Sequence, residues 1–445
     1  MASSTVNAGL CLIHDMQNAH TAGLRTGICL FDISGFFDNV NCPRLVQLIQ
    51  DLGFAPEIVR WCSSFLADRH IRLKFNGILS DPMDSMTGTP QGSPISPDLS
   101  IIYTSPLLHR VRDWTRASLG MYIDDGVLFA CADNWEEVAE SLSTNYFICI
   151  DWPMRVGMAV EPDKTELLFF RKQREKVKPP SSIHLRIPTI SSYYRVKAST
   201  TVRYLGFYID HRLQWSRHVD IMCNRARASI KALQILGNLV RGISFAQWRL
   251  VFNAVCLPVL TYGRQLWYTG KQVSLVLKLQ RVQNEAVTVI SGSFSMAPRD
   301  PLHQILSIPP MDLRLDMLTL SSALRLYRLP RDSQPLKHLS GPWSEHSEHD
   351  LPIPAPPCKA AKTALKWLAS RVPSNGPRIE AFPLTPPPRS PALERTPHHP
   401  PGRGRCCRSE PGTRPGRDLL PRHPHLHRVP IWETKGCYSR TPLHG

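Results

Sequence analysis

The chain has 445 residues, of which 42% are hydrophobic, so it can bury a sizeable core in about two or three domains. Its net charge of +17 favours a polyanionic partner. The 12 cysteines are scattered without a C-x-x-C pair, which argues against a zinc site and a disulfide framework, and neither a signal peptide nor an apolar run of membrane-spanning length is found. We therefore expect an intracellular protein with reduced thiols and no membrane partner.

The charge is divided unevenly along the chain. Residues 1–170 carry 11 Lys and Arg against 20 Asp and Glu, whereas residues 211–300 carry 12 against 3. This division suits a metal-binding part followed by a part that holds phosphates.

The first predicted elements are a helix over residues 6–22, a buried strand and two further helices. The strand, residues 28–33, is apolar except for Asp32 near its end. An aspartate that leaves such a strand is costly to bury without a partner. Pro43 and Pro56 then each begin a helix with an apolar stripe.

Two weaker patterns follow. Residues 70–77 alternate apolar and basic side chains, which predicts a half-exposed strand closed by a turn at Asn76 and Gly77. Residues 87–108 form a loop of small residues that opens a helix. Such a loop lets backbone amides approach a phosphate, although an ordinary turn explains it equally well.

The segment 121–130, MYIDDGVLFA, predicts a tight β-hairpin with its turn at the Asp-Gly step. The turn would hold Asp124 and Asp125 at its tip. Adjacent carboxylates repel each other, which favours a cation beside them. The alternative is that Asp-Gly is simply a good turn sequence.

The rest of the chain changes from mixed to helical and then to proline-rich composition. We expect a helix from Trp135, a turn and strand over 161–170, a strand pair over 202–210, and helices from 215 to about 329. Of the 40 prolines, 23 lie in residues 330–445, where only residues 360–368 are typical of a helix. We expect disorder in most of this range.

Three features occur in an order that indicates phosphoryl transfer: a strand ending at Asp32, a Pro-Gln-Gly loop, and a hairpin carrying two aspartates. Two-metal phosphoryl transfer needs carboxylates from separate strands around ions about 4 Å apart. The stretches FDISGFFD, TGTPQGSP and YIDD resemble motifs A, B and C of reverse transcriptases, and GMAVEPDKTELLFF and YLGFYID resemble motifs D and E.

The sequence between the motifs, including NVNCPRLVQLI, is similar to that of non-LTR (LINE-like) retrotransposon polymerases, and the resemblance extends over about residues 8–330. The resemblance implies an α+β fold: a polymerase palm over 1–210, with an antiparallel sheet, packed helices and fingers largely absent. A helical, basic thumb or connection over 211–330 and a Pro/Arg-rich, largely disordered tail over 331–445 would follow.

The resemblance also implies roles for single residues. Asp32, Asp124 and Asp125 would be the catalytic aspartates, and the Ile33 carbonyl a further metal ligand. Phe37 would select dNTPs, Gln91, Gly92 and Tyr122 would contact the nucleotide or template, and Tyr204, Leu205 and Gly206 would form the primer grip. Lys164 would help to protonate pyrophosphate, unless it is only a solvated turn lysine. Asp38 would be a structural partner rather than a ligand.

The implied reaction is RNA-templated DNA synthesis with two Mg²⁺ ions, or Mn²⁺ in their place, acting on an RNA template, a DNA primer and dNTPs. The competing hypothesis is a catalytically inactive retroelement remnant that at most binds nucleic acid, because the basic fingers that should precede motif A are not found. A group II intron maturase is disfavoured because the residues between the motifs fit LINE-like sequences better.

Overall fold

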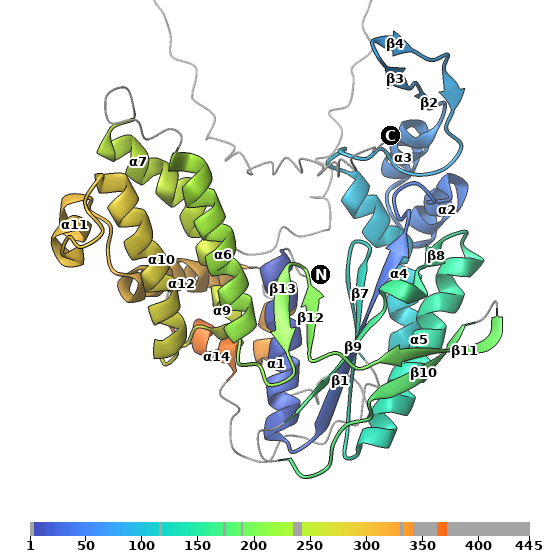
Figure 1. The fold of residues 1–445 in the computed structure, drawn as a ribbon. Helices are drawn as coiled ribbons and strands as arrows, with labels where there is room; N and C mark the ends of the chain where they lie inside the picture. Colours follow the sequence, from blue (N-terminus) through green and yellow to red (C-terminus); the bar gives the residue numbers. More distant parts are fainter. Residues whose placement is uncertain are drawn as a thin grey trace, which may run out of the picture. The chain divides into compact units, whose positions relative to one another are not determined.

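The fold is built around one central strand, β1 (Arg25–Ser34), which lies in an antiparallel sheet (Figure 1). On one side β1 pairs with β7 (Asp125–Ala132), which in turn pairs with β6 (Ser118–Tyr122). On the other side it pairs with β9 (Glu166–Phe170) and, at its end, with β8 (Ala159–Val160). The mixed helix-and-sheet fold expected from the sequence is confirmed.

The computed structural model describes residues 4–114, 118–171, 175–187, 190–234, 243–329, 333–340 and 363–371. Contacts divide the chain into two units, Met1–Phe382 and Pro383–Gly445, and every described residue belongs to the first. Most of the range predicted as a tail therefore lies outside the described residues.

Helices cover both faces of the sheet because successive side chains of a strand point to opposite faces. Ile28 of β1 packs in the core with α1 (Thr5–Thr21). Its neighbour Cys29 packs in a second core with α5 (Trp135–Arg155) and α4 (Ser96–Trp114). The apolar run of β1 is thus explained by burial on both sides.

The helices predicted at Pro43 and Pro56 are α2 (Cys42–Asp51) and α3 (Pro56–Leu66). The strand predicted over 70–77 was partly wrong, because it is broken into short pieces whose side chains are all exposed. The predicted turn is present, with φ of +48° at Asn76 and +83° at Gly77. Within 70–77 lie β2 (His70–Ile71) and β3 (Lys74–Phe75), which pair with the later short strands β5 (Met83–Asp84) and β4 (Ile78–Leu79), respectively.

Two hairpins follow the sheet. The first, β10 (Ser182–Ile187) with β11 (Ile190–Lys197), was not predicted, although the alternating Ile183, Leu185 and Ile187 of β10 are buried. The second is the predicted pair over 202–210. It consists of β12 (Thr201–Tyr204) and β13 (Phe207–Asp210). Earlier in the chain, a short helical turn, η1 (Pro162–Lys164), lies between β8 and β9.

The helical region expected from residue 215 is present in the described ranges. Its long helices are α6 (Ser216–Leu233), α10 (Val273–Ser291) and α12 (Met311–Tyr327). No helix in the described ranges is long and apolar enough to cross a membrane. The shorter helices are α7 (Phe245–Val251), the π-helical turn η3 (Phe252–Cys256), α8 (Leu257–Leu260), α9 (Arg264–Trp267) and α11 (Arg299–Ile305).

Two helices from the range predicted as a tail pack against the first helix of the chain. They are α13 (Gln334–Ser340) and α14 (Ala364–Ala369), and both contact α1. The short helix predicted over residues 360–368 corresponds to α14. In an apolar cluster, Leu10 of α1 meets Leu365 of α14.

Buried polar contacts fix these helices on α1. The His14 ring contacts Thr363 Oγ1 at 2.7 Å and the His338 carbonyl at 3.0 Å. Burial lowers the pKa of His14 to about 4, so the ring is neutral, donates through Nε2 and accepts from Thr363. Beside it, His338 Nδ1 lies 2.8 Å from Asp15 Oδ1.

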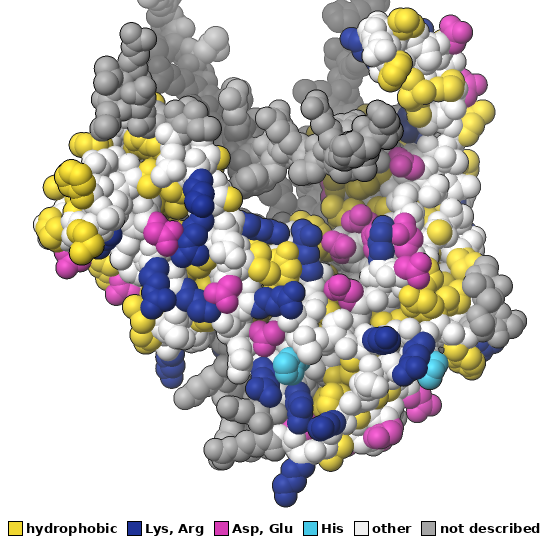
Figure 2. All heavy atoms as spheres, in the orientation of Figure 1, with side chains coloured by type: hydrophobic (Ala, Val, Ile, Leu, Met, Phe, Trp, Pro, Cys, Tyr) yellow, Lys and Arg dark blue, Asp and Glu magenta, His cyan; other side chains and the backbone are white. Residues whose placement is uncertain are grey.

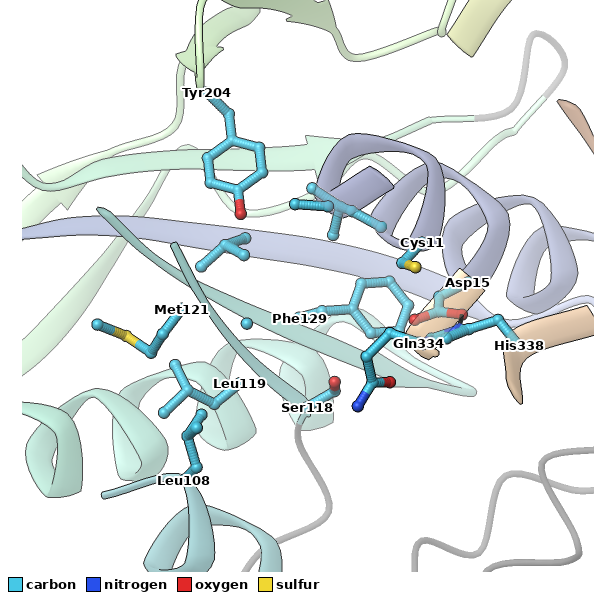
Figure 3. Close-up of a pocket in the computed structure, with 14 residues that line it drawn as sticks. Cys11, Asp15, Leu108, Ser118, Leu119, Met121, Phe129, Tyr204, Gln334 and His338 are labelled. Atoms are coloured by element: carbon cyan, nitrogen blue, oxygen red, sulfur yellow. Dashed lines mark hydrogen bonds and ion pairs between the residues drawn. The ribbon is translucent and has the colours of Figure 1, made fainter. Parts of the chain in front are cut away.

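A cavity of about 190 Å³ lies between α1, the β6–β7 hairpin and α13. Figure 3 shows Asp15 and His338 at one end of it, with Met121 and Tyr204 at the other. The back of the hairpin is therefore not fully packed against α1.

Candidate active site

The central strand and the hairpin bring three aspartates to one end of the sheet. Asp32 of β1 lies directly opposite Asp125, the first residue of β7. Asp124 lies in the turn of the hairpin, and its carbonyl accepts a hydrogen bond of 3.2 Å from Ile33 N–H. Residues more than 90 positions apart in the chain therefore share one site because β1 and β7 pair in this register.

The predicted position of the hairpin turn was wrong. Tyr122 pairs with Asp125, so the turn residues are Ile123 and Asp124, not the Asp-Gly step. Ile123 has a φ of +60°, which is strained for a β-branched residue. Gly126 lies within β7 opposite Phe31, and a Cβ built there would come within 2.6 Å of Cε1 of that ring. The glycine is needed for close packing, not for the turn.

Burial and neighbouring charges perturb the ionisation of the two hairpin aspartates. Burial raises the pKa of Asp125 to about 6, and the charges of Asp124 and Asp32 add to the rise. Burial and then the charge of Asp32 also raise the pKa of Asp124. Arg203, whose role was not predicted, acts in the opposite direction on Asp125. The only indication in the sequence that Arg203 lies near the aspartates was its position next to Tyr204.

Lys164 lies at this site, as the sequence suggested, but in an ion pair. Its Nζ lies 3.2 Å from Asp32 Oδ2 and 2.8 Å from Glu161 Oε2. Hydrogen bonds to Glu161 and Asp32 raise the pKa of Lys164. Glu161 was not predicted, although its i,i+3 spacing from Lys164 on a turn was a usable signal.

The small-residue loop packs against the turn that follows β1. Thr89 N–H donates to the Phe37 carbonyl at 2.7 Å, and Gln91 Nε2 donates to Asp38 Oδ1 at 3.0 Å. Asp38 thus has a structural partner in the loop. Gly92 is exposed and has a φ of +88°, a conformation that favours glycine.

The predicted primer-grip residues form the turn between β12 and β13. Leu205 and Gly206 occupy the turn with φ of +48° and +83°, and Tyr262 Oη donates to the Leu205 carbonyl at 2.8 Å. Tyr204 is buried, and its pKa is raised first by burial and then by the charge of Asp125. Burial also raises the pKa of Tyr122, with a further contribution from Tyr262. This turn therefore lies near the carboxylates.

The donor set fits a hard divalent cation. Carboxylate oxygens are the ligands that Mg²⁺ prefers, and positive charge would relieve the repulsion that raises the pKa values of Asp124 and Asp125. Within the described ranges, however, no three His, Cys, Asp or Glu side chains are already arranged to hold an ion. The ion pair of Asp32 with Lys164 occupies part of the donor set.

Residues 3–209 match the family described as "Reverse transcriptase (RNA-dependent DNA polymerase)". These residues form a reverse transcriptase domain. It is of the non-LTR retrotransposon type, as the motifs suggested. Reverse transcriptase domains in general use divalent metal ions.

Curated relatives of this reverse transcriptase domain come from insect mobile elements. The chain is 25% identical over 302 residues to a probable RNA-directed DNA polymerase from transposon BS of Drosophila melanogaster, covering 67% of this chain and 32% of the relative. It is 21% identical to the polymerase of the mobile element jockey from the same species, covering 72% and 36%. The chain thus spans about a third of the length of these relatives.

Among solved structures, apo telomerase from Candida Tropicalis aligns with 83% of this chain and 57% of its own, at 11% identity and a TM-score of 0.37. Telomerase from Candida albicans in complex with a fragment of telomeric RNA aligns with 70% and 55%, also at 11% identity and a TM-score of 0.37.

Proposed function

We propose that this reverse transcriptase domain catalyses RNA-templated DNA synthesis, in which a primer 3′-hydroxyl attacks the α-phosphate of a dNTP and releases pyrophosphate. The observation that carries the proposal is the register of β1 with β7, which places Asp32 opposite Asp125 next to Asp124. Carboxylates from separate strands are what two-metal phosphoryl transfer requires.

Asp32, Asp124, Asp125 and the Ile33 carbonyl would hold two Mg²⁺ ions, or Mn²⁺ in their place. Ions bound there would lower the pKa of the primer hydroxyl and neutralise charge on the triphosphate. The raised pKa values of Asp124 and Asp125 support this role, because both carboxylates gain most from a nearby cation.

Lys164 would supply the proton that the leaving pyrophosphate takes up. A lysine is protonated at neutral pH, and the hydrogen bonds to Glu161 and Asp32 raise the pKa of Lys164 further. For this role the Lys164 ammonium must leave Asp32 as the substrate phosphates approach, because the Asp32 carboxylate and the phosphates compete for the same positive charge.

The substrate contacts would come from the loops around the aspartates. Phe37 would exclude the ribose 2′-hydroxyl, and Gln91, Gly92 and Tyr122 would contact the nucleotide or template. The hydrogen bond from Gln91 to Asp38 supports this proposal, because it holds the exposed loop near the end of β1.

Tyr204, Leu205 and Gly206 would hold the primer end. The hydrogen bond from Tyr262 to the Leu205 carbonyl supports that role, because it fixes the turn between β12 and β13.

Residues 1–210 would then be the palm and 211–330 a thumb or connection. Figure 2 shows Lys and Arg side chains gathered over α6. Arg217, Arg225 and Lys231 are exposed on that helix. A basic helix face of this kind would bind the phosphates of a template and primer.

A primer-extension assay on poly(rA)/oligo(dT) with Mg²⁺ tests the proposal on the full chain. Extension should occur and be lost in Asp124→Ala. The matched control, Asp133→Ala, removes an exposed aspartate beyond the strand and should leave extension unchanged. Absence of extension in the wild-type chain, or extension that survives Asp124→Ala, would refute the mechanism.

A second candidate function is nucleic-acid binding without catalysis, as expected of an inactive remnant. The ion pair between Lys164 and Asp32 favours it, because it ties up one of the three carboxylates. Binding of RNA that weakens steeply with salt, is lowered by Arg225→Glu and is accompanied by no extension would support this function instead.

A further inference from the structure

The hairpin β10–β11 has one buried face and one exposed, basic face. Three apolar side chains of the hairpin are buried in a core that also contains residues of α5: Ile183, Leu185 and Val196. The opposite face consists of three cross-strand pairs: Ser182 with Lys197, His184 with Arg195, and Arg186 with Tyr193. Five side chains of these pairs are exposed, and we call them the basic platform: His184, Arg186, Tyr193, Arg195 and Lys197.

The positive charge of the basic platform is not balanced by nearby residues in the sequence. Residues 176–200 contain five Lys and Arg and no Asp or Glu, and Glu175, directly before this range, pairs with Arg25. Figure 2 shows Lys and Arg side chains over this hairpin. None of the five basic side chains forms an ion pair with another described residue: Lys176, Lys178, Arg186, Arg195 and Lys197. Unbalanced surface charge of this kind attracts a polyanion.

Two guanidinium groups of the basic platform are held in place by neighbouring side chains. Arg195 Nε donates to Ser182 Oγ at 2.9 Å, which uses one of the five N–H groups of the guanidinium. The guanidinium carbon of Arg186 lies 5.0 Å from the ring centre of Phe147 on α5. A guanidinium that is already held in place loses less side-chain freedom when it binds a phosphate.

Tyr193 adds an aromatic ring to one end of the basic platform. Its side chain is 67% exposed and lies opposite Arg186 in the register of the hairpin. Successive cross-strand pairs on one face are about 7 Å apart, so the ring and the basic groups form a short ladder. An exposed tyrosine beside arginines can stack on an unpaired base, whereas the bases of a duplex are already stacked on one another. The platform, all of whose residues are described, contains no aliphatic side chain of the kind that membrane-bound helices insert.

We propose that the basic platform binds a single-stranded nucleic acid. Arg186, Arg195 and Lys197 bind successive phosphates, and one unpaired base stacks on Tyr193. This contact is additional to those proposed at the aspartates and on α6, because the platform belongs to a separate hairpin that packs against α5. It increases affinity for the nucleic acid and takes no part in the chemical step, so the proposal does not depend on catalysis.

Fluorescence anisotropy of the full chain with labelled oligouridine RNA and oligothymidine DNA of about 12 nucleotides tests the proposal, without Mg²⁺ or dNTPs. The double variant Arg186→Gln with Arg195→Gln should bind the preferred strand at least about tenfold more weakly. The slope of log K against log salt should become shallower by about 1.4, which is about 0.7 for each lost phosphate contact. The comparison of RNA with DNA shows which strand the platform prefers.

The tyrosine is tested by its own pair of variants. Tyr193→Ala should weaken single-strand binding at least about fivefold and leave the affinity for a duplex of the same length unchanged. Tyr193→Phe keeps the ring and should remain within about twofold of the wild type. Loss of duplex binding equal to the loss of single-strand binding would contradict base stacking and overturn the proposal.

A matched control removes the same charge from another exposed hairpin of the chain. Arg72→Gln with Lys74→Gln should leave the affinity within about twofold of the wild type, because exposed Asp81 and Asp84 lie on the same β2–β5 segment. An equal loss in this control, or an unchanged affinity in the Arg186 and Arg195 double variant, would overturn the proposal. Binding to phosphatidylserine vesicles that requires Arg186 and Arg195, with no change in single-strand affinity, would assign the platform to a membrane instead. A chain that lacks primer extension but shows the expected differences would support this proposal and refute only the catalytic one.

Discussion

Gly126 gives the sharpest test of how the hairpin is built. A Cβ at this position would overlap the ring of Phe31, whose Cε1 would be 2.6 Å away, about 1 Å inside normal contact. Phe31 is buried and lies on the central strand, and its ring also contacts Tyr146 edge-on, so it has little room to move. We expect Gly126→Ala to lower the free energy of unfolding by about 3 kcal/mol, at the upper end for overpacking.

The double variant with Phe31→Ala distinguishes a clash from a general defect. Phe31→Ala alone should lower the free energy of unfolding by about 3–5 kcal/mol, because removing the ring leaves a cavity. The three atoms nearest to the added methyl group all belong to this ring. With the ring removed, the double variant should therefore be no less stable than Phe31→Ala alone. This corresponds to a coupling energy of about 3 kcal/mol.

Equilibrium urea unfolding of the full chain, followed by circular dichroism, measures these differences. Gly120→Ala in β6 is the control. Its added Cβ would meet Cγ1 of Val127 at 3.0 Å and the Val127 carbonyl oxygen at 3.9 Å but no aromatic ring, so we expect the free energy of unfolding to change by less than about 1 kcal/mol. Additive costs for Gly126→Ala and Phe31→Ala would refute the reasoning.

Three further predictions concern charged groups. The pKa of Asp125 rises from 3.8 to about 6 on folding. The contribution of this carboxyl group to the free energy of unfolding is therefore fully present below pH 4 and is lost as the pH rises through 6. Asp125→Asn should therefore stabilise the metal-free protein at pH 8 by about 1–2 kcal/mol after allowance for solvent screening, and a melting-temperature gain already present at pH 4 would contradict this. Lys164→Met should raise the affinity for Mn²⁺ several-fold in a calorimetric titration because it frees Asp32, and an unchanged affinity would show that the ion pair does not compete with the metal. His338→Ala should cost about 1–3 kcal/mol and speed proteolytic cleavage next to α13, because it leaves Asp15 buried without its imidazole; equal cleavage rates would count against this role.

The sequence allowed prediction of features that depend on local pattern. The apolar run of β1, the stripes of α2 and α5, and the turn at Asn76 and Gly77 all follow from residues close together in the chain. The same holds for the order of the motifs that carry the aspartates.

Features set by distant neighbours were missed or placed wrongly. Gly126 was taken as a turn residue because Asp-Gly is a strong turn signal, whereas its real constraint is the ring of Phe31, 95 positions earlier. The ion pair of Lys164 with Asp32 joins residues 132 positions apart. The hairpin β10–β11 was missed because its alternation directly follows residues 171–182, a charged and proline-rich stretch of a composition typical of a loop.

The docking of α14 on α1 has a consequence for the order in which the chain folds. His14 must find Thr363, which lies 349 residues later in the sequence. At about 5–20 residues per second, a ribosome needs roughly 20–70 s to make the intervening chain. During that time the outer surface of α1, including Leu10, has no permanent cover from α14. The newly made protein therefore exposes this outer apolar surface of α1 until translation passes residue 369, and a truncation before that point would leave the surface permanently without α14.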